Sequence, residues 1–293
     1  MKKPASQLKR IGLIANPEKT DRVDLVSHAA RAVAKTGRQL LLDPATASLI
    51  NWPTTPLAGA EALARACDML LVFGGDGTIL RVARETAGIG TPIMGLNVGG
   101  LGFLTAASGK KLTGALAKLW EGQYTIEPLA MIEACTGRGR GQRHLALNDV
   151  VISRGRIPRL IELAVSVDDE PVTRYRCDGL IVCTPTGSTA YSLAAGGAVV
   201  TPRAEVLALT PICPHTLSNR ALIISLKSTL TIEVLNHRAD TYLNADGKFQ
   251  TELAPGQRVV IRRSTQKTRL VRLAGRSFFE TLRHKLQWSG SHV

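Results

Sequence analysis

Asp76 stands out chemically because it is a lone carboxylate inside a glycine-rich run. The run is Gly74-Gly75-Asp76-Gly77-Thr78, directly after the apolar stretch Met69–Phe73 and directly before a helix-like stretch. Glycines let a backbone approach a phosphate closely, and unpaired N–H groups at a helix start attract anions. The run is neither a Walker A loop nor a GxGxxG fingerprint. It predicts a turn that offers its carboxylate to a metal or a substrate hydroxyl; the alternative is an ordinary turn with Asp76 as helix N-cap.

A second glycine-rich loop follows the next apolar stretch, Pro92–Leu96. It runs Asn97-Val98-Gly99-Gly100-Leu101-Gly102-Phe103-Leu104. Loops at the ends of neighbouring parallel strands converge on one crevice, as phosphate binding requires. The alternative is a structural crossing where only glycine fits. Together the two loops predict one phosphate-binding edge.

Two further segments carry polar groups suited to a nucleotide. From Cys177 to Ser192 an apolar strand leads into a turn rich in hydroxyl groups, where small residues would let a flat polar ligand lie close to the backbone. Tyr191 could stack on a base or be a core or interface tyrosine. Asn148 and Asp149, inside the predicted strand Ala146–Ser153, could hold sugar hydroxyls or mark a bulge or sheet edge.

These residues need elements to position them, and the first 125 residues or so alternate strands with helices. The predicted strands are Ile11–Ala15, Gln39–Leu42, Met69–Phe73 and Pro92–Leu96. The predicted helices are Asp24–Lys35, Ala58–Cys67, Ile79–Ala87 and Leu112–Trp120. This alternation predicts an α/β N-terminal domain, a parallel sheet with flanking helices.

From about Tyr124 the pattern changes to strands without helices between them. The predicted strands are Met131–Cys135, Ala146–Ser153, Leu160–Val167, Thr173–Tyr175, Leu180–Cys183, Ala221–Ser225, Leu230–Leu235, Arg258–Arg263 and Arg269–Leu273. This is typical of an all-β, sandwich-like C-terminal domain. We expect domains at 1–125 and 126–275, and a tail at 276–293 whose helix, Phe278–Leu286, packs back on the first domain.

The composition of the chain argues against several classes of function. Lys+Arg 37 against Asp+Glu 23 gives the 293 residues a net charge of +14, which attracts anions without specifying them. Aromatic content of 4% and scattered basic residues argue against nucleic acid. The five cysteines never form CxxC, which favours a reducing cytoplasm over a disulfide framework or zinc site. The uncharged stretch 179–202 holds too many glycines, prolines and hydroxyls for a membrane span, so we expect no membrane partner.

Taken together, these residues resemble the NAD kinase family of the bacterial type. The resemblance rests on the GGDGT run, the Asn148-Asp149 pair, a block beginning at Asp178 (DGLIVCTPTGSTAYSLAAGG) and the segment TPICPHTLSNR ending at Arg220. It extends from Ile11 to beyond Asp246. The departures are Asp149 for the usual glutamate, Ala194 for serine, Ala221 for proline and Lys248 for glutamine.

The resemblance implies transfer of the terminal phosphoryl group of ATP, or polyphosphate, to the 2′-hydroxyl of the adenosine ribose of NAD⁺, making NADP⁺. Asp76 would be the general base. The resemblance implies ligand contacts around the base, at Gly74, Gly75, Gly77, Thr78 and Arg81. It implies that Asn148 and Asp149 bind the ribose, that Asp178 faces the nicotinamide part, and that the adenine pocket is lined by Thr189, Ala190, Tyr191, Ser192, Leu193 and Ala194. Further ligand contacts are implied at Arg159, Arg176 and Lys248. Arg81 could instead be a solvated helix arginine, and Arg159 and Arg176 could be ordinary charged edges of strands.

The same resemblance implies Mg²⁺, or another divalent metal, which enters with the phosphoryl donor because no cage of carboxylates is visible. It also implies a homodimer or homotetramer. Three rivals remain open: a lipid kinase, a sugar kinase like phosphofructokinase, and a dinucleotide sensor without catalysis. The lipid kinases lack the TPTGSTAYS block, and the sugar kinase would need a larger α/β second half. Intact Asp76 and Asn148 speak against the sensor.

Overall fold

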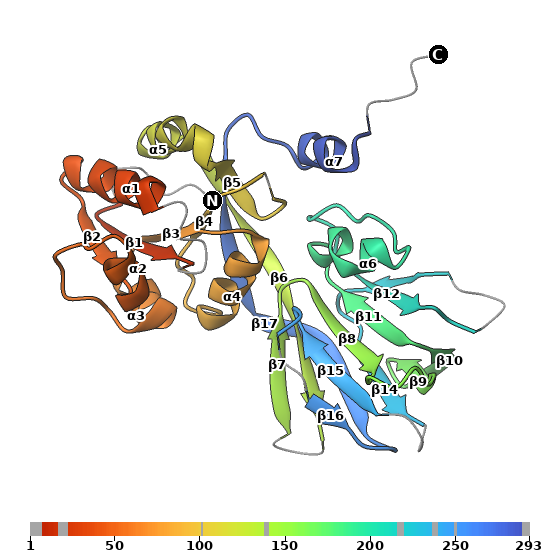
Figure 1. Ribbon diagram of the computed structural model, residues 1–293. Helices are drawn as coiled ribbons and strands as arrows, with labels where there is room; N and C mark the ends of the chain where they lie inside the picture. The colour runs from red at the N-terminus through yellow and green to blue at the C-terminus, as the bar shows by residue number, and fades with distance from the viewer. Residues whose placement is uncertain are drawn as a thin grey trace, which may run out of the picture. The chain divides into compact units, whose positions relative to one another are not determined.

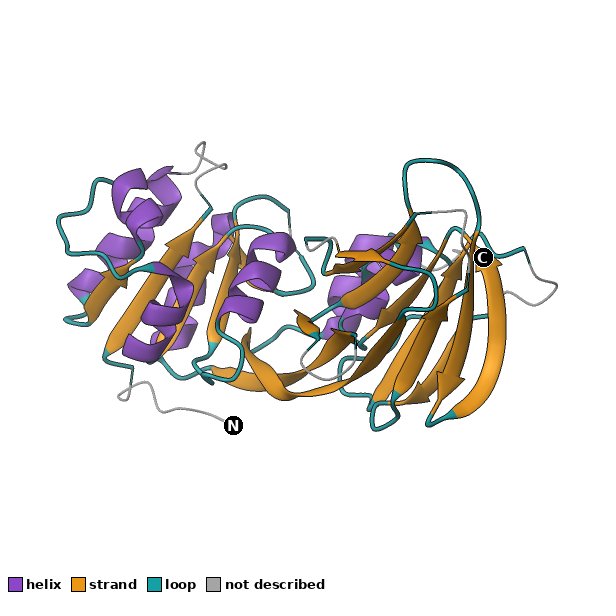
Figure 2. Cartoon of the chain, turned by 90° about the horizontal axis from the view of Figure 1, so that it is seen from below, coloured by secondary structure: helices purple, strands orange, loops and turns teal. Residues whose placement is uncertain are grey.

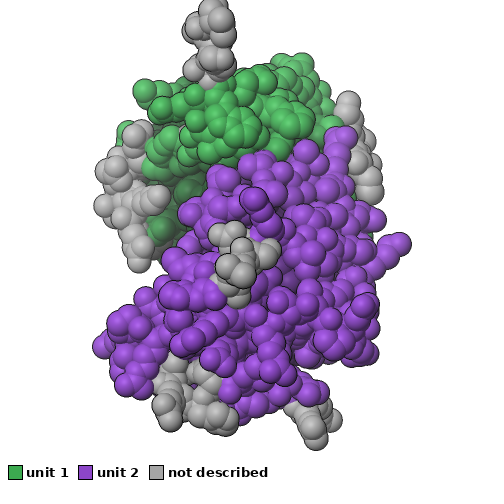
Figure 3. All heavy atoms as spheres, turned by 90° about the vertical axis from the view of Figure 1, so that its right-hand side faces the viewer, with its two compact units in different colours: residues 1–129, 267–293 green, residues 130–266 purple. Residues whose placement is uncertain are grey.

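The computed structural model describes residues 8–16, 23–100, 102–137, 141–215, 220–235, 240–248 and 251–288. The chain divides into unit 1, residues 1–129 and 267–293, and unit 2, residues 130–266 (Figure 3). Two long strands, β6 (Tyr124–Thr136) and β17 (Arg258–Leu273), belong partly to each unit. The expected bounds at 125 and 275 differ from these because both crossings fall inside a strand, where the residue pattern has no break.

Unit 1 is built on a parallel sheet. Its strands β1 (Arg10–Ala15), β2 (Gln39–Leu42), β3 (Met69–Phe73) and β4 (Ile93–Asn97) lie in the order β4-β3-β1-β2, with Phe73 opposite Leu96. A fifth strand, β5 (Thr105–Ser108), pairs in parallel with β4. The predicted parallel sheet is thereby confirmed, and β3 and β4 end at the same edge.

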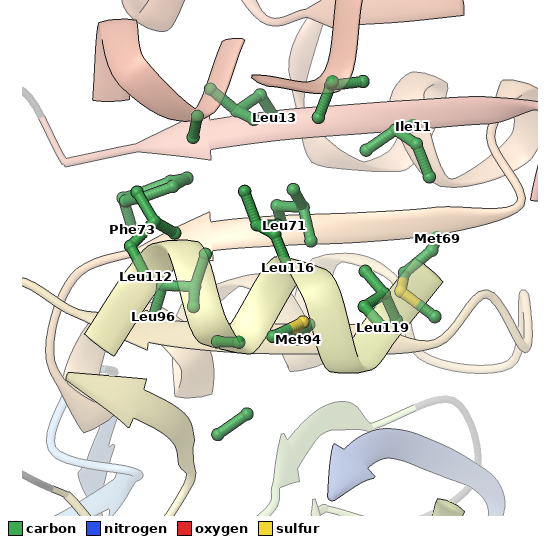
Figure 4. Close-up of a cluster of buried hydrophobic side chains, with 14 of the residues drawn as sticks. Ile11, Leu13, Met69, Leu71, Phe73, Met94, Leu96, Leu112, Leu116 and Leu119 are labelled. Carbon is green, nitrogen blue, oxygen red and sulfur yellow. The ribbon is translucent and has the colours of Figure 1, made fainter. Parts of the chain in front are cut away.

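Helices cover both faces of this sheet (Figures 1 and 2). They are α1 (Val23–Lys35), α2 (Pro44–Leu49), α3 (Gly59–Ala66), α4 (Asp76–Glu85) and α5 (Leu112–Trp120). A further helix, α7 (Phe278–Leu286), lies near the end of the chain. Figure 4 shows Leu112, Leu116 and Leu119 of α5 over alternate residues of β3 and β4. Each such leucine contributes about 1.5–3 kcal/mol when fully buried. On the other face Ile79 of α4 packs so closely on β4 that a side chain at Gly95 would overlap it.

Helix α2, strand β5 and the 3-10 turn Gly109–Lys111 of unit 1 were not predicted, and helix α4 begins early. Helix α2 starts after Asp43, whose carboxylate accepts the Thr46 N–H at 3.3 Å, with Pro44 in the first turn. Strand β5 is too short and too small in its side chains to show a pattern. Helix α4 begins at Asp76 rather than Ile79, since glycine in the first turn hides the helical period.

Unit 2 holds two antiparallel sheets that enclose an apolar core. One contains β10 (Glu170–Cys177), β9 (Ile161–Val167), β14 (Leu230–Val234) and β17 in this order, with β6 beside β7 (Gln142–Ala146). The other runs β13 (Leu222–Ser225), β12 (Val206–Ile212), β11 (Gly179–Cys183), β8 (Asp149–Arg154), β15 (Thr241–Ala245), β16 (Thr251–Leu253). Alternate residues of both sheets fill the core, which confirms the sandwich-like class.

The structure corrects two expected strand bounds in unit 2 and adds strands that were not predicted. The predicted strand Ala146–Ser153 begins only at Asp149, as β8, because Ala146 is the last residue of β7 and Asn148 lies between the two strands. The two strands expected at the end of the chain are one, β17. Strands β7, β12, β15 and β16 were not predicted. Turn-forming residues border the short β15 and β16, and Pro211 lies within β12.

The remaining sequence expectations concern thiols and membranes. All five cysteines are free, and burial raises the thiol pKa of Cys67 and Cys177 to about 12 and that of Cys183 to about 11. Within the described residues, no helix is both long enough and apolar enough to cross a bilayer.

Candidate active site

Asp76 occupies the first position of helix α4, directly beyond the end of strand β3. The N-cap of this helix is Gly75, so the alternative of Asp76 as N-cap is not what the structure has. Gly74 donates its N–H to Leu96 of the neighbouring strand at 3.0 Å. A Cβ atom on Gly74 would lie 2.6 Å from the Cβ of Thr78, so only glycine allows this turn. Asp76 is half-buried and Gly77 is exposed.

The Asp76 carboxylate binds the second glycine-rich loop. Its Oδ2 accepts the Phe103 N–H at 3.0 Å and its Oδ1 accepts the Leu104 N–H at 3.2 Å. Gly102 is the residue that allows this approach, because a Cβ there would overlap the carboxylate. The two loops predicted to converge are thus joined through Asp76 itself, and each oxygen keeps a lone pair for a further donor.

Asn97 fixes the beginning of the second loop. Its side-chain oxygen accepts the Gly99 N–H at 2.9 Å, and its amide donates to the Gly100 carbonyl. The side chain is buried at the end of β4. A short buried amide that bonds its own loop makes the loop a defined structure, although Leu101 lies outside the described residues.

Arg81 lies one turn along α4 and is engaged on the helix surface. Its Nη1 contacts Glu85 at 3.0 Å, an i,i+4 ion pair between partly exposed side chains. Such a pair contributes about 0.3–0.5 kcal/mol to stability, so another anion can replace the Glu85 carboxylate at little cost. The structure therefore has Arg81 in the solvated arrangement, with a contact weak enough to be replaced by a phosphate.

The second group of candidate residues lies in unit 2, around the start of strand β8. Asn148 precedes the strand, and Asp149 is its first residue, on the face that carries Val151 and, from β11, Cys183. The Asn148 carbonyl accepts the Thr184 N–H at 2.9 Å. The Asn148 Oδ1 atom is buried without a hydrogen-bond partner, which is a costly state that a ligand donor would relieve.

Asp246 holds this pair in place, and the sequence analysis did not identify it. One carboxylate oxygen accepts the N–H groups of Asn148 at 2.8 Å and Asp149 at 3.2 Å, and the other accepts that of Leu147 at 3.1 Å. Asp246 adopts a positive φ of 48° in its turn. Asp246 precedes Gly247, as is common in tight turns, but this local pattern gives no hint of a contact about a hundred residues away.

Asp149 is buried beside a second carboxylate. Burial, and to a lesser degree the charge of Asp246, raise the Asp149 pKa from 3.8 to about 7. The side chain is only 5% exposed. Asp149 therefore changes its protonation state in the neutral pH range, as groups at functional sites often do.

The hydroxyl-rich segment folds into a short helical turn over the same sheet face. The 3-10 turn Gly187–Thr189 is followed by α6 (Tyr191–Ala194). A side chain at Gly187 would overlap the backbone of Asn148, so this glycine brings the segment onto the Asn148–Asp149 pair.

The neighbours in α6 differ sharply in accessibility. Tyr191 is 47% exposed, whereas Ser192 is fully buried with its Oγ 2.9 Å from the Thr210 Oγ1. Thr189, Ala190 and Leu193 are half-buried and Ala194 is exposed. Tyr191 has a face available for a ligand, while the Ser192 hydroxyl is engaged inside the fold.

Asp178 lies at the other end of the β8–β11 pair from Asp149, because Gly179 is opposite Ser153 and Cys183 is opposite Asp149. It forms an ion pair that the sequence did not suggest. Its Oδ1 lies 2.6 Å from the Nε of Arg154, and both side chains are about one third exposed. The pair is formed where β8 and β11 run side by side, with the Arg154 N–H bonded to the Asp178 carbonyl at 3.0 Å. Arg154 therefore sets the direction of the Asp178 carboxylate.

The remaining predicted residues are at the surface of unit 2. Arg176 lies on β10 with its Nε 3.9 Å from the carboxylate of Glu162, its partner residue on β9. Arg159 and Lys248 are exposed in loops. For Arg176 this is the charged strand-edge arrangement named as the alternative. Of the segment ending at Arg220, residues 216–219 lie outside the described residues.

Comparison with known proteins supplies an independent measure of likeness. Residues 11–124 match the family model described as ATP-NAD kinase N-terminal domain, and residues 147–273 match ATP-NAD kinase C-terminal domain. Two curated proteins called NAD kinase, from Desulforamulus reducens and Symbiobacterium thermophilum, are each 41% identical over 94% of this chain and cover 96% and 98% of their own lengths.

Solved structures agree with these matches. A yeast NADH kinase complexed with NADH superposes with a TM-score of 0.83 at 25% identity, covering 98% of this chain and 89% of its own. An NAD kinase from Archaeoglobus fulgidus in complex with ATP gives a TM-score of 0.77 at 25% identity, covering 96% and 100%. The likeness spans both units.

Proposed function

Since this chain belongs to the NAD kinase family, we propose that it phosphorylates NAD with Asp76 as the general base. Its activity is that of an NAD kinase, a phosphotransferase that acts on NAD and a phosphoryl donor. The product is NADP. The roles of individual residues, the metal and the assembly are our proposals.

The observation that carries the role of Asp76 is the way its carboxylate is held. One N–H from each of two successive residues, Phe103 and Leu104, binds one oxygen each, which fixes the orientation and leaves a lone pair on each oxygen. In the reaction the 2′-oxygen of the adenosine ribose bonds to the terminal phosphorus of the donor. The bond from that phosphorus to the leaving ADP, or to the shortened polyphosphate, breaks at the same time. The hydroxyl proton passes to Asp76, which orients the nucleophile.

We propose that the residues around β8 and α6 hold the adenosine part of NAD. The unpartnered Asn148 Oδ1 and the Asp149 carboxylate are acceptors suited to ribose hydroxyls. The exposed ring of Tyr191 suits stacking on the adenine. Asp178, oriented by Arg154, would meet the nicotinamide end.

We propose that the divalent metal binds as a complex with the phosphoryl donor. Among the described residues, no three His, Cys, Asp or Glu side chains come together as a metal cluster. Mg²⁺ prefers few protein ligands and several phosphate oxygens, so we treat the magnesium complex of ATP or polyphosphate as the substrate. The net charge of +14 favours the approach of both polyanions.

We further propose a homodimer or homotetramer in the cytoplasm. The assembly follows from the family resemblance, and the location from five free cysteines without CxxC spacing. Analytical ultracentrifugation at several concentrations tests the assembly. A monomer at all of them would contradict it.

The decisive experiment measures NADP⁺ formation from NAD⁺, ATP and Mg²⁺ with wild type and Asp76→Asn. The variant keeps the shape of the side chain but removes the base, so kcat should fall by at least about 100-fold while the protein stays folded. Isothermal titration with NAD⁺ separates binding from chemistry. Equal rates in both proteins would keep the activity and remove the role of Asp76. Binding of NAD⁺ without product from ATP or polyphosphate would favour the sensor.

A further inference from the structure

An arginine far away in the sequence reaches the loop that binds Asp76. Arg272, near the end of β17, donates from its Nη1 to the Phe103 carbonyl at 2.8 Å and from its Nε to Glu127 at 2.8 Å. Its side chain is 27% exposed and that of Glu127 is 20% exposed. All of these residues belong to unit 1. Two hydrogen bonds therefore orient the guanidinium at a site that is only partly exposed to solvent.

The bond to Phe103 matters because of the peptide group to which that oxygen belongs. The Phe103 carbonyl and the Leu104 N–H are two ends of one planar peptide unit. The Leu104 N–H donates to the Asp76 Oδ1 at 3.2 Å. A cation thus lies at the oxygen end of the peptide dipole and a carboxylate at its N–H end, so each bond polarises the peptide in the sense that strengthens the other.

We propose that Arg272 is a positioning residue for phosphoryl transfer and acts on Asp76 through the Phe103–Leu104 peptide. This inference rests on the proposed role of Asp76 as base. Arg272 holds the peptide so that its N–H points at Oδ1, and this orients the lone pair that takes the proton of the substrate hydroxyl. A small rotation of a base is enough to lower a rate strongly, because proton transfer needs aligned partners.

An arginine suits this task better than a lysine. Its planar fork bonds Glu127 and the carbonyl at the same time, whereas an ammonium group has no fixed direction. Arg276 provides a natural comparison, since it donates to the Thr105 carbonyl at 3.1 Å and also contacts that of Ala106. Arg276 therefore binds the start of strand β5, directly after the loop, rather than the peptide that binds Asp76.

The test compares kinetics and stability of the full chain for Arg272→Gln, Arg272→Lys, Arg276→Gln and Arg269→Gln. Arg269 lies on the same strand and bonds the Gly90 carbonyl at 2.9 Å, away from Asp76, so its variant should keep wild-type rates. We expect Arg272→Gln to lower kcat about 10–100-fold with the KM for NAD⁺ changed less than about 3-fold. Arg272→Lys should recover part of the loss.

A double-mutant cycle with Asp76→Asn shows whether the effect passes through Asp76. In that background the Arg272→Gln change should alter the residual rate less than about 3-fold. Equal losses in both backgrounds, a wild-type kcat in Arg272→Gln, or a loss of kcat in Arg276→Gln as large as in Arg272→Gln would overturn the inference. If Arg272→Gln does not fold, Arg272→Lys decides, with a lower kcat at unchanged KM expected.

The outcome also separates this inference from the proposed function. Full activity in Asp76→Asn would show that Asp76 is not the base, and Arg272 would then have no base to position. An inactive Asp76→Asn beside a fully active Arg272→Gln would leave the base in place and remove only the positioning role.

Discussion

A Cβ atom on Gly102 would lie 2.7 Å from the Cγ of Asp76, so the backbone of the second loop lies directly on the carboxylate. This contact makes one unit of two glycine-rich loops that are separated by a complete helix and strand. It also defines the orientation of Asp76, since the carboxylate has the loop backbone on one side and only the other side for a substrate.

Substitution of Gly102 tests this relationship. Gly102→Ala should push the carboxylate aside, lower kcat about 10–100-fold and destabilise the chain by about 1–3 kcal/mol. The matched control is Gly100→Ala in the same loop, where a Cβ atom meets nothing within 4 Å. Steady-state kinetics and thermal unfolding check both. Wild-type activity in Gly102→Ala would show that the contact does not restrain Asp76.

Asp149 should make the stability depend on pH. Its folded-state pKa of about 7 lies above the ordinary 3.8, so the folded chain holds more protons between these values. The free energy of unfolding therefore falls as pH rises from about 4 to about 7, and the Asp149 contribution is constant above that. The difference between the two pKa values corresponds to a fall of at most about 4 kcal/mol in the free energy of unfolding. Asp149→Asn should abolish this fall.

Urea unfolding at pH 5, 7 and 9 measures the effect. The Asp149→Asn variant should gain stability relative to wild type from pH 5 to 7 and then gain no more. Asp24→Asn, on the exposed face of α1, is the control and should run parallel to wild type. Parallel curves for Asp149→Asn as well would mean that its carboxylate is not destabilised by burial.

Asp246 should influence NAD binding without touching NAD. Asp246→Asn keeps the side-chain shape but replaces one oxygen that accepts a backbone N–H from the 147–149 segment by an amide donor. We expect the KM for NAD⁺ to rise about 10-fold, with a smaller change in kcat. Asp169→Asn is a matched control, because Asp169 also adopts a positive φ in an exposed turn. An unchanged KM in Asp246→Asn would exclude this role.

Substitutions of the adjacent residues Tyr191 and Ser192 should have different effects, the first on NAD⁺ binding and the second on stability. Tyr191→Ala removes an exposed ring and should raise the KM for NAD⁺ with little change in melting temperature. Ser192→Ala leaves the buried Thr210 hydroxyl without its partner and should destabilise the chain by about 1–3 kcal/mol. Thermal unfolding and KM together decide. The opposite pattern would reverse the roles given to these two residues.

The sequence predicted the fold class and most elements of unit 1 because their signals are local. Strands β2 and β3 and helices α5 and α7 begin and end where apolar periodicity indicates. The glycine-rich turn before α4 was visible for the same reason, since glycine and a following helix are neighbours in the chain. In unit 2 most of the antiparallel strands were recognisable, but β7, β12, β15 and β16 were not.

What the sequence could not predict are contacts between segments far apart in the chain. Asp246 binds the backbone at Asn148, Arg154 pairs with Asp178, and Arg272 reaches the Phe103 carbonyl. Each of these residues has an ordinary surrounding sequence. Their partners are determined by sheet register and loop packing, for which a residue pattern carries no information.

The sequence by itself therefore determined the two-part architecture, the family resemblance and the identity of the candidate base, because motifs and periodicity depend on neighbouring residues. Only the tertiary structure decided how that base is held, that Ser192 faces inward beside an exposed Tyr191, and that Asp149 is buried next to a second carboxylate. Orientation and burial arise when distant segments pack together, and hydrogen-bond geometry and desolvation then set the chemistry of each group.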